Sequence, residues 1–170
     1  AQAAFGISGP RAREFLAAHT ESDMSHAAFA FSTSQNIDIG PISARVQRIS
    51  YTGECGWEIF VDASFAPFLF ELLMSGERAA APKLVGLHAA ESLRTEKAYR
   101  HWGDDIADED TPLEAGLSWG VSWDKPGGFI GFDALMAQRE TGVDRRLVQF
   151  RLDDPIPLLY HDEPVYRDGV

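Results

Sequence analysis

The sequence has little of what several protein classes need. Its 170 residues contain one cysteine, Cys55, and 15 basic side chains against 26 acidic ones, giving a formal net charge of −11. A single cysteine excludes an internal disulfide and a zinc site built on paired cysteines. The negative charge opposes binding to nucleic acid or to an anionic membrane surface. The longest dense apolar run, from Phe65 to Met74, is shorter than the roughly 20 residues that a membrane-spanning helix requires.

Generic catalytic signatures are also missing. The chain has no phosphate-binding loop ending in Lys-Ser or Lys-Thr and no Gly-x-Ser-x-Gly nucleophile elbow. The run Gly127-Gly128-Phe129-Ile130-Gly131 follows no strongly hydrophobic strand, so it resembles a dinucleotide-binding fingerprint only superficially. The five histidines never stand at the spacing of metal ligands on one helix, and no metal site is predicted. Cys55 is interpreted as a small packed residue.

What is present is typical of a globular protein, with 45% hydrophobic and 24% charged residues. Alternation of apolar residues predicts extended segments, and helical spacing predicts helices. The expected strands cover residues 3–7, 27–31, 39–51 with a bulge, 57–61, 117–123 and 146–152. The expected helices cover residues 10–19, 65–74, 82–99 and 129–139. Because helices and strands mix without a repeated strand–helix–strand unit, an α+β fold is favoured over a doubly wound sheet.

The sequence at both ends of the chain predicts that it is a piece of a larger protein. Ala1 is not an initiator methionine, and residues 3–7 resemble a strand already under way. Asp168-Gly169 is a preferred two-residue hairpin turn, with only Val170 after it to open a return strand.

Two segments resemble a known family. Tyr51-Thr52-Gly53-Glu54-Cys55-Gly56-Trp57-Glu58-Ile59 is the first, and the run GLHAAESLRTEKAYRHWGDDIADEDTPLEAGL, from Gly86 to Leu117, is the second. Together they are similar to the aminomethyltransferase superfamily, whose type member is the glycine-cleavage T-protein. The closest resemblance is to the folate-binding C-terminal half of sarcosine and dimethylglycine dehydrogenases.

The resemblance implies a fold and its division. Residues 1–142 would form part of a ferredoxin-like α+β folate-binding domain of the T-protein type. Residues 143–170 would be the truncated start of a small C-terminal β-barrel, with the boundary near Thr141-Gly142.

The resemblance also implies two folate-binding residues, Tyr51 and Glu58. A pterin ring presents an N–H beside an exocyclic NH₂, and one carboxylate accepts both in a bidentate pair. An aromatic side chain packs on or beside the ring. Without the family, the alternative is an ordinary hairpin that carries a surface glutamate.

Other positions are weaker expectations. Arg100, His101 and Trp102 follow the second helix and are candidates to face the folate. Arg94 and Glu96 are interpreted as ion-pairing residues within the helix, and Glu114 as a residue that caps or orients its loop. Ala90 stands where T-proteins carry a folate-binding arginine, a departure that favours the dehydrogenase branch.

The family's catalytic aspartate lies upstream, so no catalytic residue is assigned here, and the chain alone is expected to be inactive. The hypothesis is a tetrahydrofolate-binding fragment of a sarcosine or dimethylglycine dehydrogenase-like enzyme, with a small N-methyl amine as substrate. FAD would be bound elsewhere in the longer protein, with which this piece would associate. The expected location is the cytoplasm, or the mitochondrial matrix in a eukaryote. The alternatives are a glycine-cleavage aminomethyltransferase and a non-catalytic folate-binding module.

Overall fold

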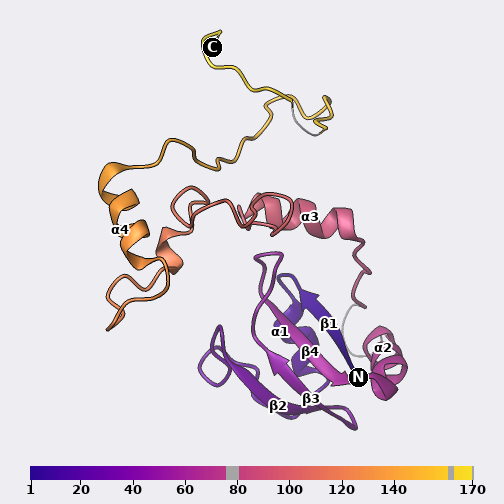
Figure 1. Ribbon diagram of the computed structural model, residues 1–170. Coiled ribbons are helices and arrows are strands. Elements are labelled where there is room, and N and C mark those ends of the chain that lie inside the picture. The colour runs from indigo at the N-terminus through magenta and orange to yellow at the C-terminus, as the bar shows by residue number, and fades with distance from the viewer. Residues whose placement is uncertain (76–80, 161–162, 170) are drawn as a thin grey trace. The chain divides into compact units, whose positions relative to one another are not determined.

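The computed structural model describes residues 1–75, 81–160 and 163–169 (Figure 1). The chain divides into two compact units, Ala1–His101 and Trp102–Val170. Each unit is described by itself.

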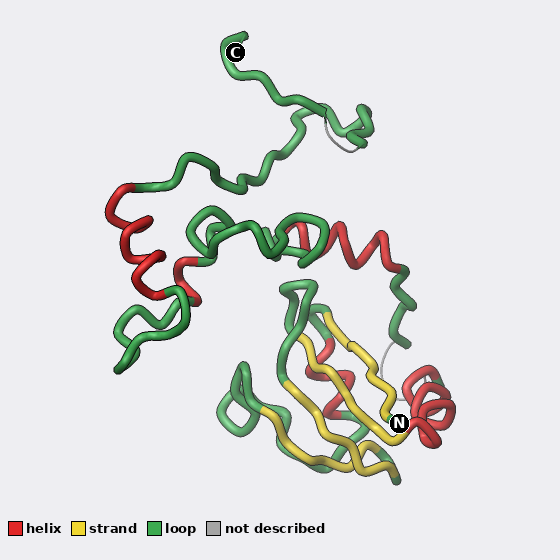
Figure 2. The backbone as a smooth tube through the Cα atoms, in the orientation of Figure 1, coloured by secondary structure: helices red, strands yellow, loops and turns green. Residues whose placement is uncertain are grey.

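A four-stranded antiparallel sheet forms the centre of the first unit (Figure 2). Its strands are β1 (Gln2–Ser8), β2 (Ser34–Ile39), β3 (Ile42–Gln47) and β4 (Gly56–Asp62), in the spatial order β1-β4-β3-β2. β2 and β3 are joined by Gly40-Pro41, and Gly40 has a φ of +54°. Glycine at the first of two turn residues suits a tight hairpin, because that position requires a positive φ. The order places β4 in the interior of the sheet.

One face of the sheet carries the hydrophobic core. The alternation of buried residues on β3 and β4 directs the side chains of Val46, Trp57 and Ile59 to the same face. Helix α1 (Ala12–Ala17) and helix α2 (Ala66–Met74), which follows the short 3-10 turn η1 (Ala63–Phe65), add their apolar residues to this core. Their buried members are Ala12, Phe15 and Leu16 of α1, and Leu69 and Leu73 of α2. The opposite face keeps its polar residues exposed or half-buried.

Helix α3 (Leu87–Glu96) completes the first unit. It begins four residues after Lys83 and ends before Lys97, so it is shorter than the expected helix over residues 82–99. Its one buried residue is Arg94, whereas Val85 lies outside the helix and is exposed. Apolar spacing within residues 82–99 predicts an inner face made by Val85, Ala89 and Leu93, and this prediction is wrong, because Val85 and Ala89 are exposed and Leu93 is only half-buried.

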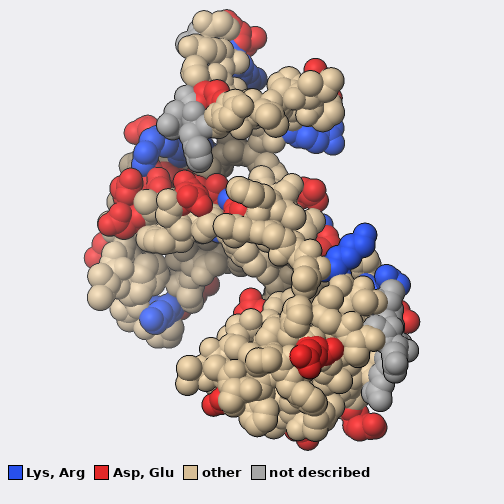
Figure 3. Space-filling model, turned by 90° about the vertical axis from the view of Figure 1, so that its right-hand side faces the viewer, with Lys and Arg blue, Asp and Glu red and all other residues tan. Residues whose placement is uncertain are grey.

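The second unit has fewer regular elements. It contains the 3-10 turn η2 (Ser118–Gly120) and helix α4 (Phe132–Thr141), joined by loops. In the space-filling view, acidic side chains gather in a patch (Figure 3). The loop that opens this unit is rich in acidic residues, at positions 104, 105, 108, 109 and 110 of the sequence.

Several predicted elements are confirmed and others are wrong. The strands at residues 3–7 and 57–61 and the helices at 65–74 and 129–139 are present, with shifts at their ends. The expected strand over 39–51 is the last residue of β2, a turn and β3. The expected strand over 27–31 is a turn, and that over 117–123 contains η2. Residues 146–152 form no strand within the described chain, because a β-strand needs a partner for its backbone hydrogen bonds.

The mixed helix-and-sheet fold is confirmed in this coarse form. Asp168 and Gly169 both have positive φ angles, +54° and +81°, as a two-residue hairpin turn requires. Val170 lies outside the described residues.

Candidate functional site

The connection between β3 and β4 holds the first candidate residues. The last β3–β4 pair is Gln47 with Glu58, and this pair closes the segment 48–57. Trp57 and Ile59 point into the core, so the intervening Glu58 lies on the opposite face of β4, where it is half-buried. Its carboxylate makes no hydrogen bond or ion pair with the part of the chain that the structure describes. A carboxylate in this position has its acceptor capacity available for a ligand.

A tight turn ends α3 on the other side of the site. The amide of Tyr99 donates to the carbonyl oxygen of Arg94 at 3.0 Å, and that of Ala98 donates to Thr95 at 2.9 Å. These two bonds form a Schellman motif, in which Ala98 takes the left-handed position with a φ of +56°. Glycine is the usual residue there, so an alanine stores backbone strain beside the candidate site.

Three contacts join the loop to this turn. The Tyr51 hydroxyl donates to the Arg100 carbonyl oxygen at 3.0 Å. Lys97 Nζ lies 3.2 Å from Glu54 Oε1. The backbone of Gly53, with a φ of +71°, passes directly under the Lys97 side chain, where a Cβ atom would overlap Cγ of Lys97. Glycine at position 53 is therefore required by both conformation and space.

Glu91 organises the same turn from within α3. Its Oε2 accepts from Nε and Nη2 of Arg94 at 2.6 Å and 2.5 Å, and its Oε1 lies 3.2 Å from Nδ1 of His101. Arg94 also donates through Nη1 to the Tyr99 carbonyl oxygen at 2.9 Å. The hydrogen bond from Arg94, with the nearby charges of Arg94 and His101, holds the pKa of Glu91 below its ordinary value. An ionised Glu91 thus binds the helix to the segment that follows it.

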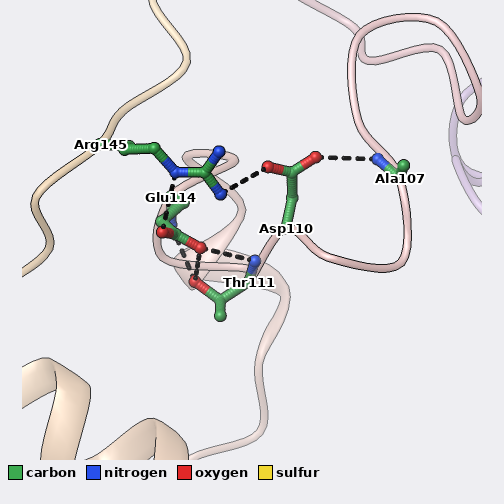
Figure 4. A network of polar contacts seen from close by, with 5 residues as sticks. All are labelled: Ala107, Asp110, Thr111, Glu114 and Arg145. Carbon is green, nitrogen blue, oxygen red and sulfur yellow. Dashed lines mark hydrogen bonds and ion pairs between the residues drawn. The ribbon is translucent and has the colours of Figure 1, made fainter.

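The second unit contains a separate polar network (Figure 4). Glu114 Oε2 accepts from the amide and the hydroxyl of Thr111, both at 2.9 Å, and the Glu114 amide donates back to that hydroxyl at 3.2 Å. This reciprocal arrangement is a capping box. Arg145 bridges Glu114 and Asp110 at 3.5 Å and 3.4 Å. The Thr111 hydrogen bonds, followed by the Arg145 charge, lower the pKa of Glu114. The prediction that Glu114 caps or orients its loop is confirmed.

The structure brings two of the four predicted folate residues together. Tyr51 and Arg100 meet, but the contact uses the Arg100 backbone, and its guanidinium donates to the Ala98 carbonyl oxygen. Glu58 lies at the base of the same loop. Trp102 belongs to the second unit, where it forms an isolated bridge with Ile106 and its side chain is exposed.

Sequence reasoning missed Tyr99 and Glu91, and it named His101 only as a residue that follows the helix and could face the folate. Tyr99 and His101 lie beside Tyr51, and Glu91 contacts His101. Arg94 forms an ion pair with Glu91, three residues before it, so the interpretation of Arg94 as an ion-pairing residue within the helix is confirmed. The i,i+3 spacing of Glu91 and Arg94 is the sequence signal that predicts this pair.

Cavities and ion sites add no further member to this site. A cavity of about 560 Å³ in the second unit is lined by the loop and helix start at residues 125–134, and none of the predicted site residues lines it. Among residues 1–75, 81–160 and 163–169, no three His, Cys, Asp or Glu side chains are grouped to hold a metal ion. Within the same ranges, no helix has the length and hydrophobicity needed to cross a bilayer.

Comparison with known proteins places this chain in a family. The family model described as the GCVT N-terminal domain matches residues 1–125, and the chain belongs to this family. The crystal structure of glycine cleavage system aminomethyltransferase T from Bartonella henselae superposes with a TM-score of 0.68 at 29% identity. That match covers 83% of this chain and 37% of the bacterial one.

The curated relatives include both amine dehydrogenases or oxidases and aminomethyltransferases. The chain is 39% identical over its whole length to a 4-methylaminobutanoate oxidase (formaldehyde-forming) of Paenarthrobacter nicotinovorans, of which it covers 21%. It is 37% identical over 96% of its length to human mitochondrial sarcosine dehydrogenase, of which it covers 18%. Dimethylglycine dehydrogenases and aminomethyltransferases also match. The chain therefore spans about a fifth of the length of the first two relatives. The resemblance to aminomethyltransferases and to sarcosine and dimethylglycine dehydrogenases is confirmed.

Proposed function

We propose that this chain is the tetrahydrofolate-binding part of a folate-dependent N-methyl amine dehydrogenase of the sarcosine or dimethylglycine type. The longer protein would transfer a one-carbon unit from the amine to tetrahydrofolate, in the cytoplasm or, in a eukaryote, in the mitochondrial matrix. FAD would be held outside this chain and supply the oxidation of the amine. Folate supplies the nitrogen nucleophile that takes up the one-carbon unit.

The observation that carries the proposal is the environment of Glu58. Its half-buried carboxylate lies on the face of β4 opposite the core, without a hydrogen-bond or ion-pair partner among the described residues, at the base of the loop that bears Tyr51. A carboxylate beside an aromatic ring fits a pterin, because the carboxylate accepts two adjacent N–H groups and the exposed ring covers a flat heterocycle. Tyr51 and Glu58 would bind and orient the folate, and holding the two reactants close together lowers the activation barrier for transfer of the one-carbon unit.

The test is calorimetric titration of 5-formyltetrahydrofolate, a stable reduced folate, into the full-length gene product that contains this chain. Glu58→Gln keeps the shape and removes the charge, and we expect it to weaken binding about 10- to 100-fold, the range for hydrogen bonds to a charged group. Glu71→Ala, on the exposed side of α2, is the matched control and should leave the affinity unchanged. Saturable binding that is indifferent to Glu58→Gln would refute the assignment of Glu58, and no binding by the wild type would refute the function.

A second candidate is the aminomethyltransferase of glycine cleavage, favoured by the structural match to the bacterial T-protein. Ala90, on α3, argues against it. The resemblance aligns this alanine with a position at which T-proteins carry a folate-binding arginine. Product analysis separates the two. Methylenetetrahydrofolate formed from an N-methyl amine supports the dehydrogenase, and formation from an aminomethylated carrier protein supports the aminomethyltransferase. Free formaldehyde with folate present would place the protein with the formaldehyde-forming oxidase instead.

The division of the chain is proposed on the same basis. Residues 1–142 would belong to the ferredoxin-like folate-binding domain, and residues 143–170 would begin a β-barrel. The support is the exposed alternating segment at 146–152, in which Val148 and Phe150 are exposed and no partner strand is present among the described residues. In the full-length protein, amide hydrogen exchange should be slow across 146–152 if this segment is a strand, and fast if it is not.

A further inference from the structure

An aromatic cluster borders the proposed folate site. The ring of Tyr51 lies 6.5 Å from that of Tyr99, with a 37° angle between the planes, and 6.3 Å from that of His101, in an edge-to-face arrangement. Tyr51 and Tyr99 are 43% and 41% exposed, and His101 is half-buried. Two of the three rings, those of Tyr99 and His101, come from the segment after α3, and only His101 of these two was expected from the sequence to face the folate.

The geometry excludes insertion of a ligand ring between these side chains. At centroid distances near 6.5 Å with tilted planes, the rings already contact each other, whereas two rings that sandwich a third must be parallel and about 7 Å apart. A flat ligand is therefore limited to the exposed side of the cluster. The Tyr51 hydroxyl is already engaged with the Arg100 carbonyl, so the cluster offers ring surface at this point.

The two added rings are held in place by polar contacts from α3. Arg94 donates to the carbonyl of Tyr99, and Glu91 faces Nδ1 of His101 at 3.2 Å. Arg94 and Glu91 also bind each other, and Arg94 is buried. A fixed carboxylate on one ring nitrogen sets the orientation of an imidazole. Side chains restrained in this way lose little conformational freedom when a ligand binds.

We propose that Tyr99 and His101 extend Tyr51 into an aromatic wall that contacts the ring system of the bound folate, and that Glu91 is the positioning residue for His101. This inference rests on the proposed function, which it deepens by adding ring-contacting residues. The aromatic wall is defined here as Tyr51, Tyr99 and His101. Arg100, between the two added residues, contributes its backbone carbonyl and not its guanidinium.

Affinity measurements on the full-length gene product test the wall. Tyr99→Leu and His101→Ala should each weaken binding of 5-formyltetrahydrofolate about 3- to 10-fold, the range for losing one aromatic contact. Tyr99→Phe should leave affinity within about twofold, because the ring and not the hydroxyl makes the contact. Phe68→Ala removes a ring of similar exposure, 49%, from α2 and is the matched control.

A double-mutant cycle tests the role of Glu91. Glu91→Gln should weaken binding in the wild-type background and have no effect in the His101→Ala background, because Glu91 acts through that ring. An equal loss in both backgrounds would show that Glu91 supports the fold through Arg94 and would overturn its positioning role.

The outcomes separate this inference from the function on which it rests. If Glu58→Gln weakens binding while Tyr99→Leu and His101→Ala do not, the aromatic wall is wrong and the folate site stands. If the wild-type protein does not bind the folate, the proposed function itself is refuted. Should either variant fail to fold, the wild-type protein still gives an answer. On ligand addition, the NMR signals of the Tyr99 and His101 rings should shift more than those of Phe68, and unchanged signals would overturn the wall.

Discussion

The side chain of Lys97 lies directly over the backbone of Gly53, so closely that a Cβ atom on Gly53 would be 3.0 Å from the Lys97 Cβ and 3.2 Å from its Cδ. This contact joins the β3–β4 loop to the end of α3, two segments far apart in the sequence. The ion pair between Lys97 and Glu54 adds little to it, because exposed pairs contribute less than about 1 kcal/mol. The close approach of the backbone is the more specific part of the junction.

Gly53→Ala should therefore lower the free energy of unfolding by about 1–2 kcal/mol, the cost of placing a non-glycine residue at a φ of +71°. The overlap with Lys97 adds to this cost. Urea denaturation measures it. In a Lys97→Ala background the same substitution should cost less, since Cγ and Cδ are then absent, and an equal cost would contradict the proposed contact.

Ala98→Gly should have the opposite effect to Gly53→Ala and raise the free energy of unfolding by about 1 kcal/mol. Ala98 is the left-handed residue of the Schellman turn, and glycine adopts that conformation without steric cost. Ala90→Gly, in the interior of α3, is the matched control and should destabilise by about 1 kcal/mol. Thermal or urea unfolding distinguishes the two, and a loss of stability in both would show that Ala98 does not hold the left-handed conformation.

Leu69→Ala should destabilise the first unit by about 2–5 kcal/mol, because Leu69 is fully buried where α2 packs into the core. Phe68→Ala on the exposed side of the same helix should change stability by less than about 0.5 kcal/mol. Urea denaturation of the two variants tests which face of α2 points inward. Similar losses for both would place α2 in a different orientation.

Glu114→Gln should flatten the acid side of the pH–stability profile of the second unit. The folded-state pKa of Glu114 is lowered, first by the Thr111 hydrogen bonds, so its stabilisation is present above the ordinary glutamate pKa of about 4.3. That stabilisation is lost as the pH falls through the lowered value. Denaturation between about pH 2 and pH 7 measures it, with Glu109→Gln on the same loop as the control. An unchanged acid limb in Glu114→Gln would show that the capping box does not form.

The sequence predicted those elements whose local pattern agrees with their packing. Trp57, Ile59 and Val61 alternate on a strand with one buried face, and Leu69 and Leu73 recur on a helix, so both elements were predicted. β2 was missed, because Ser34, Gln35 and Asn36 give an edge strand a polar start that resembles a loop. Residues 117–123 alternate equally well but form a short 3-10 turn instead.

The candidate site followed a similar division. Tyr51 and Glu58 were predicted through a family motif. Arg100 was expected to face the same site, but its backbone contact with Tyr51 was not predicted. Tyr99 was missed, and His101 was named only as a residue that follows the helix, because their approach to Tyr51 depends on the turn at Ala98, where an alanine takes the place of the expected glycine. No local propensity predicts that turn.

The pair of Gln47 and Glu58 has an engineering consequence. It holds the end of β3 and the start of β4 side by side, and Trp57, which precedes Glu58, belongs to the core. The segment 48–55, which connects the two strands, is therefore the part that can be exchanged. Its length and chemistry can be redesigned to recognise a different ring, provided that Gly53 and the strand pair at its base are kept.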